Sequence, residues 1–327
     1  MSHPRTSWLV FLPVMTGLAS LSGCGAREDL PTYALPPDAT AIPDTPMALV
    51  EVARLDPRVG TLRAIAIDRA DRVYACGSGG VRVLAPDGKE LASWPLSEDG
   101  GAIAAGDDGT VYVGLAARVL KFDGLGTPLG SWSLPPLRPE HPPRVTAIAV
   151  RGGDVFVADA GALCVHRYAF TGDLVGDIGQ GDPAKDFLGL IAPSPYIDVA
   201  VDPDNADRIL VGNPGRLRVE TYSVDGKLLG HWGEPGLAPD RFAGCCNPTN
   251  LALTREGHVV TSEKGLPRVK VSDRAGKLLA YLPPTSFPET AAGIDLGVDS
   301  RNRIYVAEPV SGQIRIYELK RAKGASP

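Results

Sequence analysis

Short apolar runs recur along the chain at intervals of 38 to 52 residues. Each run is followed by a second apolar stretch, a third, and a turn of the Asp-Gly type that leads into a fourth. Four short strands in a period of about 40 to 50 residues are typical of one β-propeller blade. The pattern therefore predicts an all-β, six-bladed β-propeller with four-stranded antiparallel blades. The runs that open the six repeats are Ile65-Ala66-Ile67, Ile103-Ala104-Ala105, Ile148-Ala149-Val150, Val199-Ala200-Val201, Leu251-Ala252-Leu253 and Leu296-Gly297-Val298.

The last repeat contains only three strands, the third of which is expected over residues 313–319. The apolar segment 47–55 precedes the first repeat and can supply the missing strand. Such closure would remove free sheet edges, which favour aggregation. We therefore expect a single propeller domain over residues 47–319, followed by a polar tail over residues 320–327.

The first 23 residues are expected to be an export signal, because Arg5 precedes an apolar stretch over residues 8–21 that is too short to span a bilayer. The sequence Leu21-Ser22-Gly23-Cys24 resembles the lipobox of bacterial lipoproteins. This resemblance implies that Cys24 is lipidated and anchors an extracytoplasmic protein. In that family an Asp after the cysteine marks retention in the inner membrane, so Gly25 implies the outer membrane of a Gram-negative envelope. The alternative is an ordinary secreted protein.

Residues 24–46 are expected to form a proline-rich tether behind the lipidated cysteine. An extended chain of this length could hold the folded body up to roughly 70 Å from the bilayer. Removal of Arg5 with the signal leaves 32 basic and 38 acidic side chains. This negative balance argues against nucleic acid as a partner.

The later strands carry phrases such as Val81-Arg82-Val83, Ile314-Arg315-Ile316 and Pro86-Asp87-Gly88-Lys89. These phrases resemble the NHL-repeat family over residues 47–319. The run Gly244-Cys245-Cys246-Asn247-Pro248, followed by Thr261-Ser262-Glu263-Lys264-Gly265, is similar to a pattern in NHL-repeat lipoproteins and secreted proteins of unsettled activity. The resemblance implies the propeller fold, whereas a shared fold does not fix function.

In an antiparallel propeller, the loops that lead into the blades and the loops after the second strands share one rim. The long segments 133–147, 179–198, 233–250 and 283–295 all fall on that rim. Long loops on a rigid scaffold commonly carry binding sites. We therefore predict a binding rim on blades 4–6, with a polar outer ring at the second-strand ends. The candidate binding residues are Asp159, Asn213, Cys245, Cys246, Asn247, Glu263, Lys264 and Glu308.

The residue before each opening run is alanine in the first three repeats and polar in the last three, where it is Asp198, Asn250 and Asp295. We expect these three side chains to converge at the mouth of the central channel. Oxygen ligands of this kind suit Ca²⁺ or another divalent cation. The trio resembles the calcium site of lactonase-type propellers, although that family adds a glutamate from another blade and Ala64 stands here. The alternative is that the three side chains bond to loop backbone.

Cys245 and Cys246 are adjacent in the loop that leads into blade 5. In an oxidising compartment they could form a vicinal disulfide, or remain thiols that bind a metal or react. One of them could instead pair with Cys76 or Cys164. The chain has no Cys-x-x-Cys-His motif, so covalent haem is not indicated.

The histidines do not favour an enzyme. Alignment of the repeats places His166 level with Arg82, Glu220, Lys270 and Arg315, and predicts that this position faces solvent. The zinc-binding histidines of the amidating lyases related to NHL propellers are absent, and so is a Gly-x-Ser-x-Gly elbow. The repeated Trp94, Trp132 and Trp232 are expected to pack between blades.

The favoured function is a membrane-anchored recognition scaffold for an envelope protein, a glycan or a small ligand. One alternative is a hydrolase of lactonase or esterase type, in which a cation on Asp198, Asn250 and Asp295 polarises a carbonyl or activates water. Another is a redox or cofactor-binding propeller that uses Cys245 and Cys246. No cofactor follows with certainty from the sequence.

Overall fold

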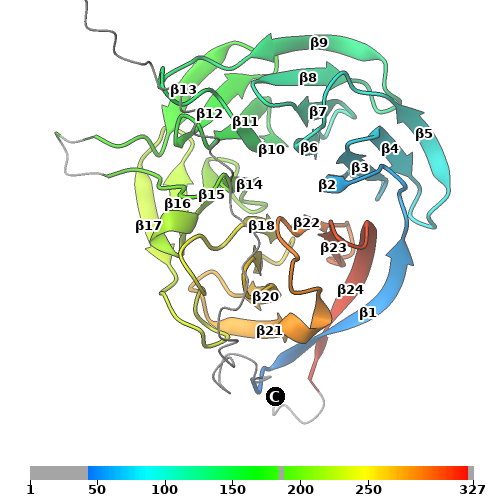
Figure 1. Ribbon diagram of the computed structural model, residues 1–327, viewed down its shortest axis with the longest axis vertical. Helices are drawn as coiled ribbons and strands as arrows, with labels where there is room; N and C mark the ends of the chain where they lie inside the picture. Colours follow the sequence, from blue (N-terminus) through cyan, green and yellow to red (C-terminus); the bar gives the residue numbers. More distant parts are fainter. Residues whose placement is uncertain (1–42, 183, 185–187, 323–327) are drawn as a thin grey trace, which may run out of the picture. The chain divides into compact units, whose positions relative to one another are not determined.

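Six four-stranded antiparallel sheets form a ring in the computed structural model, which describes residues 43–182, 184 and 188–322 (Figure 1). In blades 1–5 the first strand lies beside the central channel and the following strands step outwards, and in blade 6 the innermost strand is β22. The predicted six-bladed β-propeller is confirmed. The strands of blades 1–3 are β2 (Leu62–Ile67), β3 (Val73–Gly77), β4 (Gly80–Leu84), β5 (Glu90–Trp94), β6 (Ala102–Ala105), β7 (Val111–Gly114), β8 (Arg118–Phe122), β9 (Pro128–Ser133), β10 (Val145–Arg151), β11 (Asp154–Asp159), β12 (Cys164–Ala169) and β13 (Leu174–Ile178).

Blades 4–6 follow the same order, and their described residues include the short 3₁₀ helices η2 (Pro214–Arg216) and η3 (Pro284–Ser286). Their strands are β14 (Asp198–Val201), β15 (Arg208–Asn213), β16 (Arg218–Ser223), β17 (Leu228–Trp232), β18 (Asn250–Leu253), β19 (Val259–Glu263), β20 (Arg268–Ser272), β21 (Leu278–Leu282), β22 (Asp295–Val298), β23 (Ile304–Glu308) and β24 (Gln313–Arg321).

The N-terminal strand β1 (Met47–Leu55) is the outermost strand of blade 6 and pairs antiparallel with β24. Figure 1 shows the first and last strands of the ring side by side. Their pairing runs from Met47 opposite Arg321 to Leu55 opposite Ile314. The Arg315 guanidinium also donates to the Glu51 carboxylate at 2.7 Å. The predicted closure is confirmed, and β24 ends two residues beyond the expected 319.

Aromatic side chains from outer strands fill the wedges between blades. Trp94 of blade 1 packs on Phe122 of blade 2, and Trp132 of blade 2 packs on Tyr168 of blade 3, with ring centroids 5.4 and 5.3 Å apart. Trp232 packs likewise against Gly276 in the turn of the next blade, where a Cβ atom would clash with the indole ring. The positive φ of 88° at Gly276 also favours glycine. The predicted interblade role of the tryptophans is confirmed.

The second strands of the blades are enclosed on both faces, and the third strands range from half-buried in β8 to fully buried in β20. Every residue of β3, β7, β19 and β23 is buried, whereas β9 on the outside is largely exposed. Alternation along a middle strand therefore does not separate a core face from a solvent face. His166 and Glu220 are fully buried and Lys270 is 2% exposed. The expectation that these side chains face solvent is therefore wrong.

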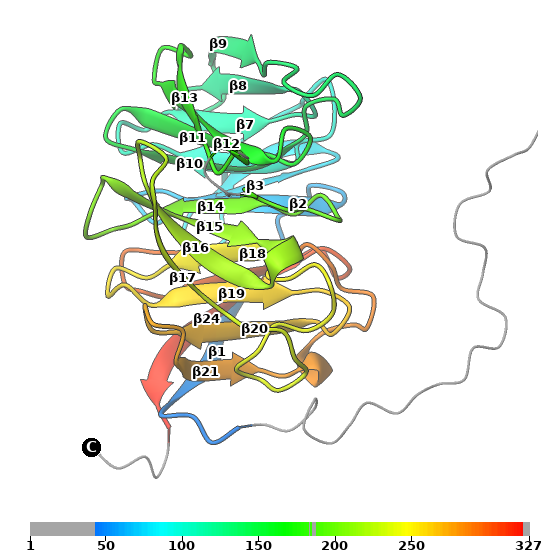
Figure 2. The same cartoon turned by 90° about the vertical axis from the view of Figure 1, so that its left-hand side faces the viewer.

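Two rims close the ends of the strands, and Figure 2 shows the strands from the side with connections at both ends. We call the rim where the inner strands begin the loop rim. It carries the described segments 56–61, 95–101, 134–144, 179–182, 188–197, 233–249 and 283–294, together with the turns after the second strands. The opposite turn rim carries the connections from first to second and from third to fourth strands. Strand β1 begins, and β24 ends, at the turn rim.

No helix among the described residues is long and apolar enough to cross a membrane. The expected export signal, Cys24 and tether residues 25–42 lie outside the described part of the chain.

Candidate functional site

Buried polar side chains end the second strand in blades 3–6. Asp159, Asn213 and Glu263 are fully buried, and Glu308 is 2% exposed. The corresponding residues of blades 1 and 2 are Gly77 and Leu115, which have no polar side chain. The ring itself therefore does not need a polar group at this position, since two blades form without one.

These four side chains hold the loop rim in place. The Asp159 carboxylate accepts bonds from the backbone N–H of Arg144 at 2.7 Å and of Gly161 at 2.8 Å. Asn213 accepts from the Ile191 N–H at 3.0 Å. These bonds fix the loops that lead into blades 3 and 4.

Glu263 and Glu308 act in the same way in the last two blades. Glu263 accepts from the Ala243 N–H at 2.7 Å and so fixes the loop that leads into blade 5. Glu308 accepts from Val310 and Ser311, both at 2.7 Å, in the turn that follows β23. The four side chains do not face outwards as a polar ring, so a ligand on this rim would contact the loops rather than the buried groups.

Glu263 also neutralises two buried cations. Arg268 donates to its two oxygens at 2.8 and 2.9 Å, and the Lys270 ammonium lies 3.0 Å away. Lys270 additionally donates to the Arg241 carbonyl and sits 3.8 Å above the centre of the Phe242 ring. Burial lowers the pKa of Lys270 to about 8, because desolvation outweighs the attraction of Glu263.

The fixed loops present large apolar side chains to solvent. Leu137, Leu188 and Leu237 lie on the loops that lead into blades 3, 4 and 5, and are 41%, 70% and 37% exposed. Val310 lies in the turn held by Glu308 and is 55% exposed. Within the described residues, blades 1 and 2 offer no exposed large apolar side chain on this rim.

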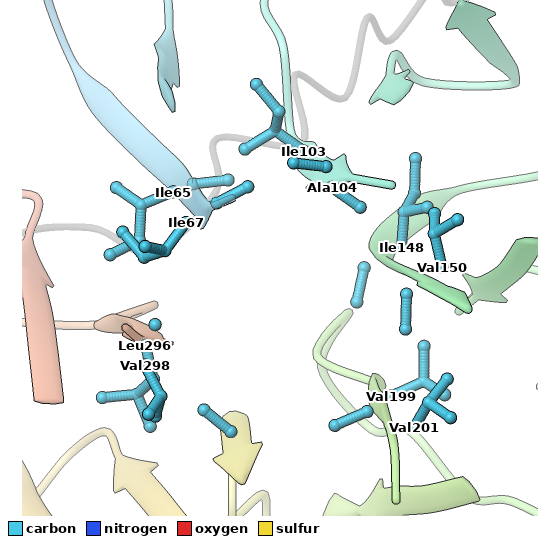
Figure 3. A pocket seen from close by; sticks show the side chains of 18 of the residues that line it. Ile65, Ile67, Ile103, Ala104, Ile148, Val150, Val199, Val201, Leu296 and Val298 are labelled. Atoms are coloured by element: carbon cyan, nitrogen blue, oxygen red, sulfur yellow. The ribbon is translucent and has the colours of Figure 1, made fainter. Parts of the chain in front are cut away.

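A cavity of about 470 Å³ occupies the central channel and is lined by the inner strands of all six blades. Figure 3 shows isoleucine, valine and leucine side chains, including Ile65, Ile148 and Val199, pointing into it. Asp198, Asn250 and Asp295 line the cavity on the side of the loop rim. The predicted convergence is observed in part, since the Asn250 amide donates to Asp295 at 3.2 Å.

The two carboxyl groups of this trio mainly join neighbouring blades. Asp198 accepts from the Leu251 N–H of blade 5, and Asp295 accepts from the Ile65 N–H of blade 1, both at 2.6 Å. Burial raises the pKa of Asp295 to about 6, and burial together with the nearby Asp295 raises the pKa of Asp198 well above its usual value. These bonds match the alternative in which the side chains bind backbone.

The Asn250 carbonyl oxygen is buried and has no hydrogen-bond partner among the described residues. This oxygen is therefore available to a cation or a ligand hydroxyl.

Cys245 and Cys246 lie on the loop rim with their sulfur atoms 3.1 Å apart. Cys245 is exposed and Cys246 is buried, and both are free thiols, as are Cys76 and Cys164. Although burial opposes ionisation, interactions with Ser194 and Cys245 and the nearby Lys264 ammonium lower the pKa of Cys246. The pair could therefore react or bind a soft metal.

Asn247 and Lys264 support this thiol pair. The buried Asn247 amide donates to the carbonyls of Ala243 and Lys264 at 2.6 and 3.1 Å, and its oxygen accepts from the Lys264 N–H. The Lys264 ammonium lies 5.3 Å from the centre of the Tyr196 ring, which belongs to the loop that leads into blade 4. The predicted rim residues 245–247 and 264 are thus brought together, with Asn247 as an internal brace.

The structure also brings together a group that the sequence did not reveal. Cys164, His166 and Asp177 offer ligand atoms within 4.8 Å of one another in blade 3. The pairing of His166 with Asp177 depends on a register shift between Arg167 and Tyr168, which the repeat pattern does not show.

Solved structures resemble this chain in fold. The WD40 β-propeller domain of Doa1 is 14% identical, with a TM-score of 0.55, and the match covers 83% of this chain and 97% of that chain. A chain of the mitotic checkpoint complex is 12% identical, with a TM-score of 0.57, and the match covers 91% and 99%. Because 1042 solved chains match, the fold does not single out a function. No protein-family model and no curated protein matches the sequence.

Proposed function

We propose that this propeller is a recognition scaffold that binds a protein partner on the loop rim of blades 3–6. The observation that carries the proposal is an asymmetry of the ring. Only blades 3–6 end their second strands with a buried polar side chain, and the same four blades present an exposed leucine or valine on the loop rim. The predicted site on blades 4–6 is thereby extended to blade 3.

This arrangement suits a protein surface as the ligand. Exposed apolar side chains that gather on one surface commonly mark interaction sites, and these four share one rim of the ring. The loop backbone around Arg144, Ile191 and Ala243 is already held by hydrogen bonds and would lose little conformational entropy on binding. The occurrence of a similar chain in the mitotic checkpoint complex accords with the use of this fold in protein assemblies.

We further propose that the chain is an NHL-repeat lipoprotein, exported and anchored to the outer membrane through Cys24. Support comes from the lipobox-like sequence and from the place where the chain enters the ring. Because β1 begins at the turn rim, a tether over residues 24–46 would join the propeller there. The loop rim would then be left free for a partner in the envelope.

A second candidate is a thiol-based redox or metal-binding function of Cys245 and Cys246. The sulfur separation of 3.1 Å and the lowered pKa of Cys246 favour this candidate. The hydrolase alternative has less support, because the carboxyl oxygens of Asp198 and Asp295 already accept bonds from the next blade.

The proposal is tested by comparing two triple variants of the full chain in the cells that produce it. Leu137→Asp, Leu237→Asp and Val310→Asp alter the loop rim, whereas Leu125→Asp, Leu129→Asp and Leu229→Asp alter comparably exposed positions elsewhere. Truncation of an interface anchor commonly costs about 1 kcal/mol or more, so the three substitutions of the rim variant together should lower its affinity for the partner at least roughly 100-fold. Equal recovery of co-purified proteins, measured by quantitative mass spectrometry, from both variants would refute the proposal.

A further inference from the structure

Four side chains in blade 3 form a compact cluster of sulfur, nitrogen and oxygen donors. Asp159 pairs with Cys164 across β11 and β12, and His166 pairs with Asp177 across β12 and β13. Residues that are opposite in antiparallel strands share a face, as do residues two apart in one strand. All four side chains therefore project from one face of the blade.

The same positions are filled differently in blades 4 and 5. The position of Cys164 is taken by Arg218 and Arg268, each of which pairs with a glutamate in its own blade. A permanent cation thus accompanies the buried acid in those blades. In blade 3 the arginine is replaced by the thiol of Cys164, and the imidazole of His166 lies two residues further on. The carboxylates of Asp159 and Asp177 therefore face no permanently charged group within the cluster.

The distances fit the donors of a small transition-metal site. The Cys164 sulfur lies 3.8 Å from both ring nitrogens of His166, and the His166 Nδ1 atom lies 2.5 Å from Asp177. With zinc bonds of about 2.3 Å to sulfur and about 2.0 Å to nitrogen or oxygen, ligand atoms of a tetrahedron lie about 3.3–3.6 Å apart. Because the sulfur is equally far from both ring nitrogens, binding requires the Cys164 side chain to rotate toward the Nδ1 side of the ring and the Asp177 carboxylate to move outwards. Asp177 has room to do so, because its side chain is 21% exposed.

Asp159 is placed to orient the imidazole. Its Oδ2 atom lies 3.3 Å from the His166 Nε2 atom, and its other oxygen is fixed by backbone N–H groups. A histidine that binds a metal through one nitrogen usually donates its other N–H to a carboxylate in this way. Without a metal, the His166 Nδ1–H donates to the Asp177 carboxylate, so a metal at Nδ1 has to replace that proton.

We propose that Cys164, His166 and Asp177 bind a divalent transition metal of the zinc class, with Asp159 as a positioning residue. Binding forms bonds from the metal to the Cys164 sulfur, the His166 Nδ1 atom and an Asp177 oxygen, and releases the thiol proton and any proton on Nδ1 to solvent. The partly exposed side of Asp177 leaves the fourth position to water. The metal would brace blade 3 beneath the loop that Asp159 holds.

Cobalt(II) is the probe for this site, because a cobalt–thiolate bond gives charge-transfer absorption that carboxylate ligands alone do not. The full chain is purified, stripped with a chelator and titrated with cobalt, in a Cys245→Ser/Cys246→Ser background that removes the other clustered thiols. We expect one equivalent of cobalt to bind with a charge-transfer band, and zinc to displace it. Cys164→Ser should abolish the band. Cys76→Ser should not, because it alters a buried thiol of β3 in blade 1, outside the cluster.

Asp177→Asn is the second variant, for the case that Cys164→Ser does not fold. Because the Asp177 side chain is partly exposed, this substitution should leave the fold intact. It should weaken cobalt and zinc binding at least 10-fold, and Asp159→Asn should weaken both 10- to 100-fold while the charge-transfer band keeps its shape. Absence of the band in the parent protein, or a band and affinity unchanged in the folded Cys164→Ser or Asp177→Asn variant, would overturn the proposal.

Discussion

Replacing Glu263 by glutamine should destabilise the propeller, because it removes the carboxylate that pairs directly with two buried cations. The substitution preserves the size of the side chain and one oxygen acceptor. It leaves Arg268 and Lys270, which are 0% and 2% exposed, without a counter-charge on β19. Loss of one partner from a buried ion pair costs about 3–5 kcal/mol.

We expect the lower end of this range, about 3 kcal/mol, for two structural reasons. Arg268 keeps bonds to the carbonyls of Leu237 at 2.8 Å and Arg241 at 2.7 Å. Lys270 can release its proton, since its pKa is already lowered to about 8. A loss of this size corresponds to a melting temperature lower by roughly 6–12 °C. Urea unfolding followed by tryptophan fluorescence measures the change without adding salt.

Glu308→Gln is the matched control, because Glu308 ends the same strand of the next blade but accepts only from backbone N–H groups. It should cost about 1 kcal/mol. The double variant Glu263→Gln/Lys270→Met should recover part of the loss, since one unpaired cation is removed. Equal losses for Glu263→Gln and Glu308→Gln, with no recovery in the double variant, would refute the charge argument.

Three further predictions follow from the same contacts. Removal of residues 1–56 should lower the melting temperature of the whole ring, because it deletes β1 and leaves β24 as an open edge, whereas removal of residues 1–42 should not. Equal melting temperatures of the two truncated chains would contradict closure by β1. Lys270→Met should change the pH dependence of unfolding. The unfolded lysine holds its proton up to a pKa of 10.5 and the folded one only to about 8, so the stability of the wild type relative to the variant should rise by about 3 kcal/mol between pH 8 and 10.5. Parallel pH curves for the two proteins would contradict this. Asp295→Asn should behave in the opposite sense, because the folded carboxyl holds its proton up to a pKa of about 6 and the unfolded one only to 3.8. The wild type should therefore lose stability relative to the variant as the pH rises from 3.8 to 6. Millimolar calcium should not raise the melting temperature of either protein, and a calcium-dependent rise in the wild type alone would instead support the hydrolase alternative.

The sequence predicted the architecture because each repeat carries its own strand and turn signals. The six opening runs, the missing strand and the long rim segments all follow from local patterns, and the pairing of β1 with β24 confirms the closure. The interblade tryptophans were also predictable, since they recur at the same place in three blades.

Burial in the middle strands could not be predicted from alternation. Neighbouring blades and loops cover both faces there, so polar residues such as His166, Glu220 and Lys270 are enclosed. Their partners come from other strands and from loops of irregular length, as the contact of Lys270 with the Arg241 carbonyl shows. The cluster of Cys164, His166 and Asp177 was missed for the same reason, because it depends on strand register.

Site-specific photocrosslinking tests the central claim most directly. A photoreactive amino acid is placed at Leu137, Leu237 or Val310 on the loop rim, and at Leu125, Leu129 or Leu229 as controls of similar exposure. The full chain is irradiated in the cells that produce it, and crosslinked proteins are identified by mass spectrometry. Our account predicts that at least two loop-rim positions capture the same protein and that the controls do not. Capture at the controls alone, or no capture from any loop-rim position, would contradict it.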